Sequence, residues 1–228
     1  MSAAPAPLEA EPGGGPKITT DGFGAAEFQN AFSATDSQIA DLQRFHDLLF
    51  DWNQRMNLVG PSARAEFWSR HVLDSAQLLR LAPDALTFAD LGAGAGFPGI
   101  VLACLLKGRE GVEVHLVESM AKRCRFLGEV VRALSLPAVV HNARAEELKL
   151  RVDVVTARAC APLVRLLDYA EPYLKRGAVG LFLKGQDVEV ELAEASKSWK
   201  FESHLTPSLS HTLGRIAEIK KVSRVRSV

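Results

Sequence analysis

The segment with the clearest chemical meaning runs from Asp90 to Gly99 and reads Asp-Leu-Gly-Ala-Gly-Ala-Gly-Phe-Pro-Gly. Glycine permits positive φ angles and lets a ligand approach the backbone closely. Pro98 in the first turn of a helix would lose only an N–H that has no partner within the helix. A turn of this kind, after the first strand of an open α/β sheet, is a place where nucleotide-like ligands bind. The segment therefore predicts a cofactor site.

The spacing and charge of this segment favour one cofactor class over another. Dinucleotide-binding turns read G-x-G-x-x-G and hold a pyrophosphate at a helix N-terminus, whereas this turn reads G-x-G-x-G-x-x-G directly after Asp90. A carboxylate there would repel a pyrophosphate but would suit a cation. S-adenosylmethionine carries a sulfonium and an ammonium and no phosphate. We therefore predict it as the cofactor, with Asp90, Gly92, Gly94 and Gly96 among its binding residues.

Two later acidic positions agree with a cofactor that contains adenosine. Glu118 ends the next expected strand, where a carboxylate can accept both ribose hydroxyls in NAD proteins and methyltransferases alike. The stretch 142–147 follows the third expected strand, where backbone groups and Glu146 could hydrogen-bond an adenine. Taken alone, a solvated strand-end carboxylate and a helix cap would explain the same residues.

Strands that alternate with helices from residue 86 onward predict an α/β fold. Strands are expected over 86–91, 112–117, 138–142, 152–156, 179–184, 201–206 and 215–222. Helices are expected over 99–106, 120–134, 162–175 and 188–198. Such connections form right-handed crossovers and a parallel sheet. We therefore predict a Rossmann-like, mostly parallel seven-stranded sheet with helices on both faces, whose last two strands form an antiparallel pair at one edge.

The chain before residue 85 predicts two further segments. Residues 1–34 are rich in Ala, Pro and Gly and bury too little apolar surface to offset the entropy of ordering, so we expect a largely disordered extension, with 1–24 disordered. Apolar residues then recur at three- and four-residue spacing, which predicts an amphipathic helix from Thr35 to about Met56 and a second helix over 63–81. The expected domains are the extension, a helical cap over 35–84 and a cofactor-binding domain over 85–228.

Composition and charge exclude several classes of protein. The 228 residues balance 27 acidic against 27 basic side chains, and no apolar run reaches the roughly 18 residues of a membrane span. The N-terminus lacks the basic and apolar blocks of a secretory signal, so we expect a cytoplasmic protein with no membrane partner. Three widely spaced cysteines without a C-x-x-C pair predict no metal site. Five basic side chains and one acidic side chain over 215–228 are compatible with phosphate contacts.

Several ordered blocks resemble one known family. They are Trp52-Asn53-x-Arg55-x-Asn57-Leu58, Arg70-His71-x-Leu73-Asp74-Ser75, the glycine-rich segment, Lys122-Arg123-x-Arg125-Phe126-Leu127, Asn142-x-Arg144-x-Glu146, Thr156-Ala-Arg158-Ala159 and Leu183-Lys184-Gly185. Over residues 42–222 the sequence resembles the RsmG family, also called GidB. These are bacterial S-adenosylmethionine-dependent methyltransferases that form 7-methylguanosine in 16S ribosomal RNA of the small subunit. Val59-Gly60-Pro61 departs from the Thr-centred continuation that is usual in the family.

The resemblance implies a role for each matching position. The cofactor-binding residues would be Asp90, Gly92, Gly94, Gly96, Phe97, Glu118, Ala145, Glu146 and Arg158. The catalytic positions would be Arg158, near the methyl donor, together with Asn57 and Arg144. RNA contacts would come from Arg123, Arg125, Lys184 and Arg215. We expect His71 to be a hydrogen-bonded structural residue.

The implied reaction fits a sequence with no evident nucleophile–base triad. The N7 of guanine carries an accessible lone pair and needs no deprotonation before it takes up a methyl group, so catalysis would rest on alignment and on the exclusion of water. The target base would have to leave its stack in 16S ribosomal RNA, our expected partner within the small subunit, before a monomer could methylate it. Three other functions stay open: a small-molecule methyltransferase, an NAD-type oxidoreductase, which Asp90 disfavours, and a non-catalytic RNA-binding protein.

Overall fold

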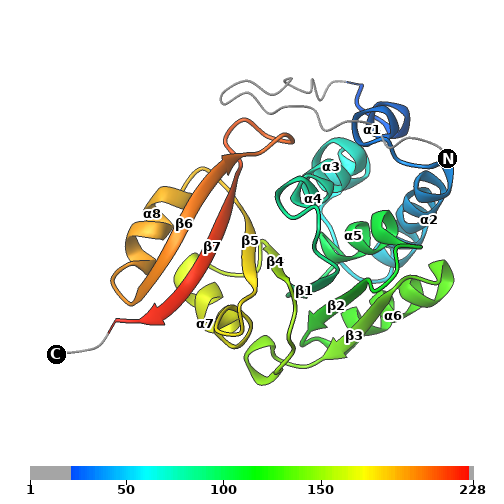
Figure 1. The fold of residues 1–228 in the computed structure, drawn as a ribbon. Coiled ribbons are helices and arrows are strands. Elements are labelled where there is room, and N and C mark those ends of the chain that lie inside the picture. Colours follow the sequence, from blue (N-terminus) through cyan, green and yellow to red (C-terminus); the bar gives the residue numbers. More distant parts are fainter. Residues whose placement is uncertain (1–21, 226–228) are drawn as a thin grey trace, which may run out of the picture.

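Seven strands form one sheet in the order β3-β2-β1-β4-β5-β7-β6 in a computed structural model that describes residues 22–225 (Figure 1). The strands are β1 (Thr87–Leu91), β2 (Glu113–Glu118), β3 (Ala138–Asn142), β4 (Val154–Arg158), β5 (Val179–Lys184), β6 (Trp199–Pro207) and β7 (Arg215–Arg224). The first five are parallel to one another, and β7 pairs antiparallel with both β5 and β6. The expected sheet, including its antiparallel edge, is confirmed.

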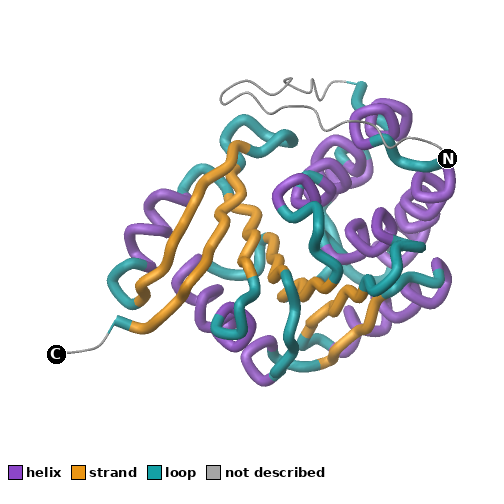
Figure 2. Tube along the Cα trace, viewed as in Figure 1, coloured by secondary structure: helices purple, strands orange, loops and turns teal. Residues whose placement is uncertain are grey.

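Helices cover both faces of this sheet (Figure 2). One face carries α2 (Asp36–Asn53), α5 (Gly99–Leu106) and α6 (Ala121–Leu134), and the other carries α7 (Leu163–Leu174) and α8 (Val188–Ala195). Successive residues of a strand point to opposite faces, and β4 shows the result. Val154 packs in the cluster that contains Phe45 of α2, whereas Val155 packs in the cluster that contains Tyr173 of α7. The N-terminal helices and the sheet therefore share one hydrophobic core.

Local hydrogen bonds define both ends of α2. The hydroxyl of Thr35 accepts a hydrogen bond from the N–H of Gln38 (3.2 Å), and the side-chain oxygen of Gln38 accepts one from the N–H of Thr35 (2.8 Å). This reciprocal capping box explains why the helix begins where the sequence predicts. At the other end, Oδ1 of Asn53 accepts hydrogen bonds from the N–H groups of Leu58 (2.8 Å) and Val59 (3.0 Å). Asn53 thus fixes the loop in which the sequence departs from the family pattern.

Helix α1 (Ala25–Phe32) lies within the extension that we expected to be largely disordered. Phe28 is fully buried, and its ring stacks on Phe32 (centroids 4.9 Å apart) and packs against Trp68 (5.7 Å). The part of the extension after residue 24 is therefore ordered, because one aromatic anchor attaches this short helix to the body, while the domain boundary at residue 34 stays a prediction. Residues 1–21 of the expected extension lie outside the described part of the chain.

The second expected N-terminal helix, over 63–81, is broken into four pieces. They are a 3₁₀ turn η1 (Pro61–Arg64), a π-helical segment η2 (Phe67–Val72), α3 (Leu73–Ala76) and α4 (Leu78–Leu81). A period of 3.6 residues cannot reveal a π-helix, which is rare and is found frequently at functional sites. The π-helical segment carries Arg70 and His71. None of the helices within residues 22–225 combines the length and hydrophobicity that a bilayer crossing requires.

Candidate active site

The glycine-rich turn between β1 and α5 adopts a conformation that side chains disfavour. Gly92, Gly94 and Gly96 have φ angles of 69°, 52° and 93°. A Cβ atom at Gly92 would lie 2.8 Å from Sγ of Cys160, which follows β4. Real Cβ atoms essentially never approach a neighbour so closely, so glycine at position 92 lets the turn lie against the chain that leaves β4. The turn and the end of β4 thus form one continuous surface.

The buried side chain of Asp90 stabilises this turn through hydrogen bonds. Its side chain is almost fully buried, and Oδ2 accepts a hydrogen bond from the N–H of Gly99 (2.9 Å) while Oδ1 accepts one from the hydroxyl of Thr156 (3.1 Å). Burial raises the pKa of Asp90 to about 7, although both hydrogen bonds oppose the shift. We expected Asp90 to contact a cationic cofactor directly. In this structure the carboxylate joins the start of α5 to β4, and its direct contact with a cofactor stays a prediction.

Glu118 faces the turn from the end of β2. Its Oε2 accepts a hydrogen bond from the N–H of Gly94 (3.1 Å), and its Oε1 accepts one from the N–H of Met120 (2.8 Å). A carboxylate offers about four lone-pair positions, so two stay available for ribose hydroxyls. The side chain of Met120 is 51% exposed and offers an apolar surface beside this carboxylate. Only its place just after the strand-end acid could have indicated Met120 in the sequence.

Arg123, which we expected to contact RNA, belongs to the same group. Its Nη1 lies 3.7 Å from Oε2 of Glu118. The guanidinium is thus paired with the carboxylate that bonds the glycine-rich turn, and the expected RNA contact by Arg123 stays a prediction. Arg125, two residues further along α6, is exposed, and its contact with RNA stays a prediction.

The residues expected near an adenine lie in a short 3₁₀ turn, η3 (Ala145–Glu147), after β3. The carbonyl of Ala145 accepts a hydrogen bond from the hydroxyl of Tyr173 (2.8 Å), which fixes this turn to α7. Arg144 has an exposed side chain, and its Nη1 lies 3.9 Å from Oε1 of Glu146. Arg144 is not part of the wall of the cavity described next, and its expected catalytic role stays a prediction.

A cavity of about 920 Å³ opens beyond the C-terminal ends of β4 and β5, where parallel α/β sheets bind their ligands. Its walls are Arg70, His71 and Asp74 from the N-terminal segment, residues 158–162 after β4, residues 183–187 after β5, Glu191, and His211, Leu213 and Gly214 from the loop between β6 and β7. Cys160 belongs both to this wall and to the contact with Gly92. The cavity therefore adjoins the glycine-rich turn.

Arg158 supplies the central positive charge of the cavity. Its guanidinium carbon lies 4.8 Å from the centre of the Phe97 ring, and its Nη1 lies 3.6 Å from Oδ2 of Asp74. Burial lowers the pKa of the Arg158 guanidinium, and the negative charge of Asp74 opposes that shift. Because a guanidinium stays protonated in proteins, Arg158 keeps its positive charge. Phe97 is only 5% exposed. The ring of Phe97 packs against the guanidinium of Arg158, and the expected contact between Phe97 and the cofactor stays a prediction.

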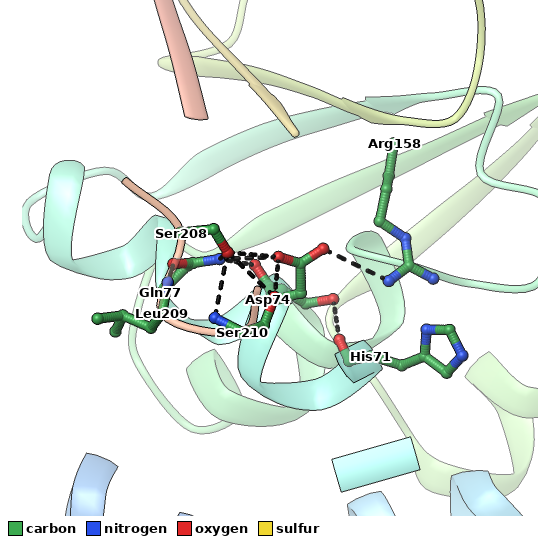
Figure 3. A network of polar contacts seen from close by, with 8 residues as sticks. His71, Asp74, Gln77, Arg158, Ser208, Leu209 and Ser210 are labelled. Carbon is green, nitrogen blue, oxygen red and sulfur yellow. Dashed lines mark hydrogen bonds and ion pairs between the residues drawn. The ribbon is translucent and has the colours of Figure 1, made fainter. Parts of the chain in front are cut away.

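His71 lies near Arg158 in this cavity (Figure 3). Its ring stacks on Phe97 with centroids 4.9 Å apart. Neither ring nitrogen has a hydrogen-bond partner among the described residues. Burial, together with the smaller effects of the charges of Arg158 and Arg70, lowers the pKa of His71 to about 3. The expected hydrogen-bonded histidine is therefore wrong, and the cavity holds a neutral imidazole between two guanidinium groups.

Two further expected positions, Lys184 and Arg215, make hydrogen bonds within the protein. Nζ of Lys184 donates to Oε2 of Glu191 (2.6 Å) and to the carbonyl of Ala161 (2.8 Å). Nη1 of Arg215 donates to the carbonyls of Thr212 (3.0 Å) and Gly214 (2.8 Å). The ammonium of Lys184 is nearly buried in an internal ion pair, whereas Arg215 is part-exposed. The RNA contacts expected of both residues stay predictions.

Asn57 is exposed and is not part of the cavity wall, and its expected catalytic role stays a prediction. The described residues also do not meet the requirements of a metal site. Within residues 22–225, no group of three or more His, Cys, Asp or Glu side chains has an arrangement that could hold a metal ion.

Known proteins are similar in sequence to this chain over most of its length. The GidB family model, described as rRNA small subunit methyltransferase G, matches residues 38–219. Ribosomal RNA small subunit methyltransferase G of Caulobacter vibrioides (strain NA1000 / CB15N) is 65% identical over 202 residues, which cover 89% of this chain and 94% of that protein. The protein of the same name from Bradyrhizobium sp. (strain BTAi1 / ATCC BAA-1182) is 50% identical over 187 residues, covering 80% and 84%.

Solved structures confirm the fold class. A SAM-dependent methyltransferase from Aquifex aeolicus is similar with a TM-score of 0.52 at 18% identity, covering 73% of this chain and 97% of that one. A putative O-methyltransferase from Klebsiella pneumoniae is similar with a TM-score of 0.56 at 10% identity, covering 89% and 99%. At these identities the likeness shows the Rossmann-like methyltransferase fold alone.

Proposed function

This chain belongs to the GidB family of rRNA small subunit methyltransferase G proteins, and from that premise we propose that it transfers a methyl group from S-adenosylmethionine to N7 of a guanosine in 16S ribosomal RNA. The observation that carries the proposal is the contact between Gly92 and Cys160, where the glycine-rich turn meets the cavity. A donor held over the turn and an acceptor base held in the cavity would face each other there.

The residues around the turn fit S-adenosylmethionine. The positive φ angles of Gly92 and Gly94 leave the turn open to a ligand, and Glu118 keeps lone pairs for a ribose. Burial raises the pKa of Cys160, the charges of Asp90 and Glu118 raise it further, and the charge of Lys184 opposes the shift, so carboxylates outnumber cations near the turn. A negative field favours a sulfonium over a pyrophosphate. When bound, the cofactor supplies an electrophilic methyl group on a positively charged sulfur.

The cavity fits a nucleotide acceptor. Arg70 lines it and has no ion-pair partner within the described part of the chain, so its guanidinium is available to a phosphate. Arg158 can donate to a phosphate or to O6 of guanine, beside the reacting N7. Because N7 already carries a lone pair, the neutral His71 does not have to act as a base. Alignment and exclusion of water are the tasks left to these residues.

The setting of the reaction is part of the same proposal. We propose that the protein acts in the cytoplasm and that its acceptor is RNA within the small ribosomal subunit. The turn and the cavity are both built from one chain, which supports a monomer as the active form.

Transfer of tritiated methyl groups from S-adenosylmethionine to small ribosomal subunits that lack the modification tests the proposal. We expect label in 16S ribosomal RNA and 7-methylguanosine after digestion to nucleosides. Label in small-molecule acceptors alone would replace this function by a small-molecule methyltransferase. Binding of NADH without binding of S-adenosylmethionine would replace it by an oxidoreductase.

A further inference from the structure

One carboxylate, that of Asp74, connects Arg158 to the loop between β6 and β7 (Figure 3). Its Oδ2 lies 3.6 Å from Nη1 of Arg158. Its Oδ1 accepts hydrogen bonds from the hydroxyls of Ser210 (2.7 Å) and Ser208 (3.1 Å). Nε2 of Gln77 donates a third hydrogen bond to the same oxygen (2.9 Å). Each oxygen of Asp74 therefore serves a different segment of the chain.

The loop between β6 and β7, residues 208–214, is firmly attached on its inner side. Besides the bonds to Asp74, the N–H of Leu209 donates to Oε1 of Gln77 (2.8 Å), and Nε2 of Gln77 donates to the hydroxyl of Ser208 (3.0 Å). Gln77 and Ser210 are 3% and 2% exposed. In so dry an environment the loss of any of these bonds leaves a buried polar group unpaired. A displacement of the loop must therefore disturb Asp74.

The outer side of the same loop faces the cavity. His211, Leu213 and Gly214 line it, and the large apolar side chain of Leu213 is 49% exposed. Ser208 and Ser210 are not part of the cavity wall. The loop thus presents one side to an incoming acceptor and the other side to Asp74.

The contact between Asp74 and Arg158 restrains the guanidinium without occupying it. A charge-assisted hydrogen bond is about 2.7–2.9 Å long, whereas this pair stands at 3.6 Å. Both side chains are largely buried, so salt screens their attraction little. Asp74 and the ring of Phe97 therefore orient the guanidinium of Arg158, while its N–H groups remain available to an acceptor.

We propose that Asp74 is a positioning residue that couples the contact between RNA and the β6–β7 loop to the orientation of Arg158. RNA seated against Leu213 holds the loop, the two serines hold Oδ1, and Oδ2 directs the guanidinium toward the acceptor. The inference rests on the proposed function, because it takes the cavity as the acceptor site.

The test removes the two hydroxyls that join the loop to Asp74. Single-turnover methyl transfer to undermodified small subunits is measured at saturating RNA and cofactor for Ser208→Ala/Ser210→Ala and for Ser203→Ala, an exposed serine on β6. We expect the double variant to react roughly tenfold or more slowly, since small misplacements of reacting groups can cost about 100-fold. The Ser203→Ala control should match the wild type, and calorimetry should give all three proteins the same cofactor affinity.

Two further variants separate positioning from general loss of structure. Asp74→Asn keeps an acceptor for the serines but removes the charge opposite Arg158, so we expect a lower maximal rate with KM for RNA within about threefold of wild type. Combining Ser208→Ala/Ser210→Ala with Arg158→Lys should cost less than the product of the separate losses, because both act through one guanidinium.

A double serine variant as fast as Ser203→Ala, or losses that multiply, would overturn the inference. If the double variant does not fold, Ser208→Ala alone, which keeps the bond from Ser210, takes its place with the same criteria. A wild-type protein that methylates no ribosomal RNA would instead overturn the proposed function.

Discussion

The carboxylate of Asp90 and the backbone N–H of Gly99 are joined by a hydrogen bond of 2.9 Å that spans the whole glycine-rich turn. The bond leads from the strand before the turn to the first residue of the helix after it. Thr156 on the neighbouring strand β4 donates to the other oxygen of the same carboxylate. A buried acid thus fixes the backbone on which a cofactor would rest, and its protonation should be visible in the stability of the fold.

Asp90→Asn should change how the stability of the protein depends on pH. Burial raises the folded-state pKa of Asp90 to about 7 from the ordinary value of 3.8, so as the pH falls the folded protein binds this proton before the unfolded chain does. The resulting stabilisation is complete below pH 3.8 and is lost as the pH rises through about 7. Between pH 5 and 7, the free energy of unfolding of the wild type should fall relative to Asp90→Asn by up to about 1.4 kcal/mol per pH unit. Urea unfolding of both proteins between pH 5 and 8 measures the difference, and parallel curves would contradict it.

Gly99→Ala should destabilise the protein, whereas Gly128→Ala should not. A Cβ atom at Gly99 would overlap the side chain of Leu116 and lie 2.8 Å from Oδ2 of Asp90. Overpacking of a filled core typically costs about 1–3 kcal/mol. Gly128 lies within α6 with no atom within 4 Å of the added Cβ, so alanine there should stabilise by roughly 0.5–1 kcal/mol. Thermal and urea unfolding compare the two variants, and equal effects would refute the tight packing of α5 on β2.

His71→Phe should make the protein less sensitive to acid. Burial lowers the folded-state pKa of His71 to about 3, below the value of about 6.5 for an unperturbed histidine. The unfolded chain therefore binds this proton first, and the wild type loses stability as the pH falls from about 6.5 toward 3. Phenylalanine can keep the stack on Phe97 and does not titrate.

The measurement for His71→Phe is the slope of unfolding free energy against pH between 4 and 6.5. We expect the wild-type slope to exceed the variant slope by up to about 1.4 kcal/mol per pH unit. Comparing slopes avoids any constant cost of fitting the larger ring. Identical slopes would show that His71 is protonated at its ordinary pKa.

The strands, the turn and their order follow from the sequence because each has a local cause. Short apolar runs define the strands. The glycines define the turn, and glycine is needed at position 92 because a Cβ atom there would meet Sγ of Cys160. The relationships across the fold have no such local signal. Nothing in the spacing of Asp74 and Ser210 indicates that they share a hydrogen bond, and nothing around Lys184 indicates its ion pair with Glu191.

Two of the expected cofactor-binding residues, Asp90 and Phe97, show what residue type alone leaves undecided. A strand-end acid and an aromatic residue in a glycine-rich turn suggest ligand contacts by their types, but burial decides their roles. Asp90 and Phe97 are 1% and 5% exposed, so they support other groups from behind. The sequence alone does not distinguish a side chain that lines a pocket from one that lies under it.

Glu118→Gln should weaken cofactor binding with little change in the fold. The carboxylate keeps lone pairs for two ribose hydroxyls, and hydrogen bonds to charged groups contribute about 1.5–3 kcal/mol each, so we expect a loss of affinity of at least roughly tenfold. Calorimetry with S-adenosylmethionine and with its demethylated product measures the effect, and Glu110→Gln, at an exposed position, is the matched control. Equal losses for both ligands identify the ribose as the contact, because only the methylated form carries the sulfonium charge. A Glu118→Gln protein that binds both ligands as tightly as Glu110→Gln would remove Glu118 from the cofactor site.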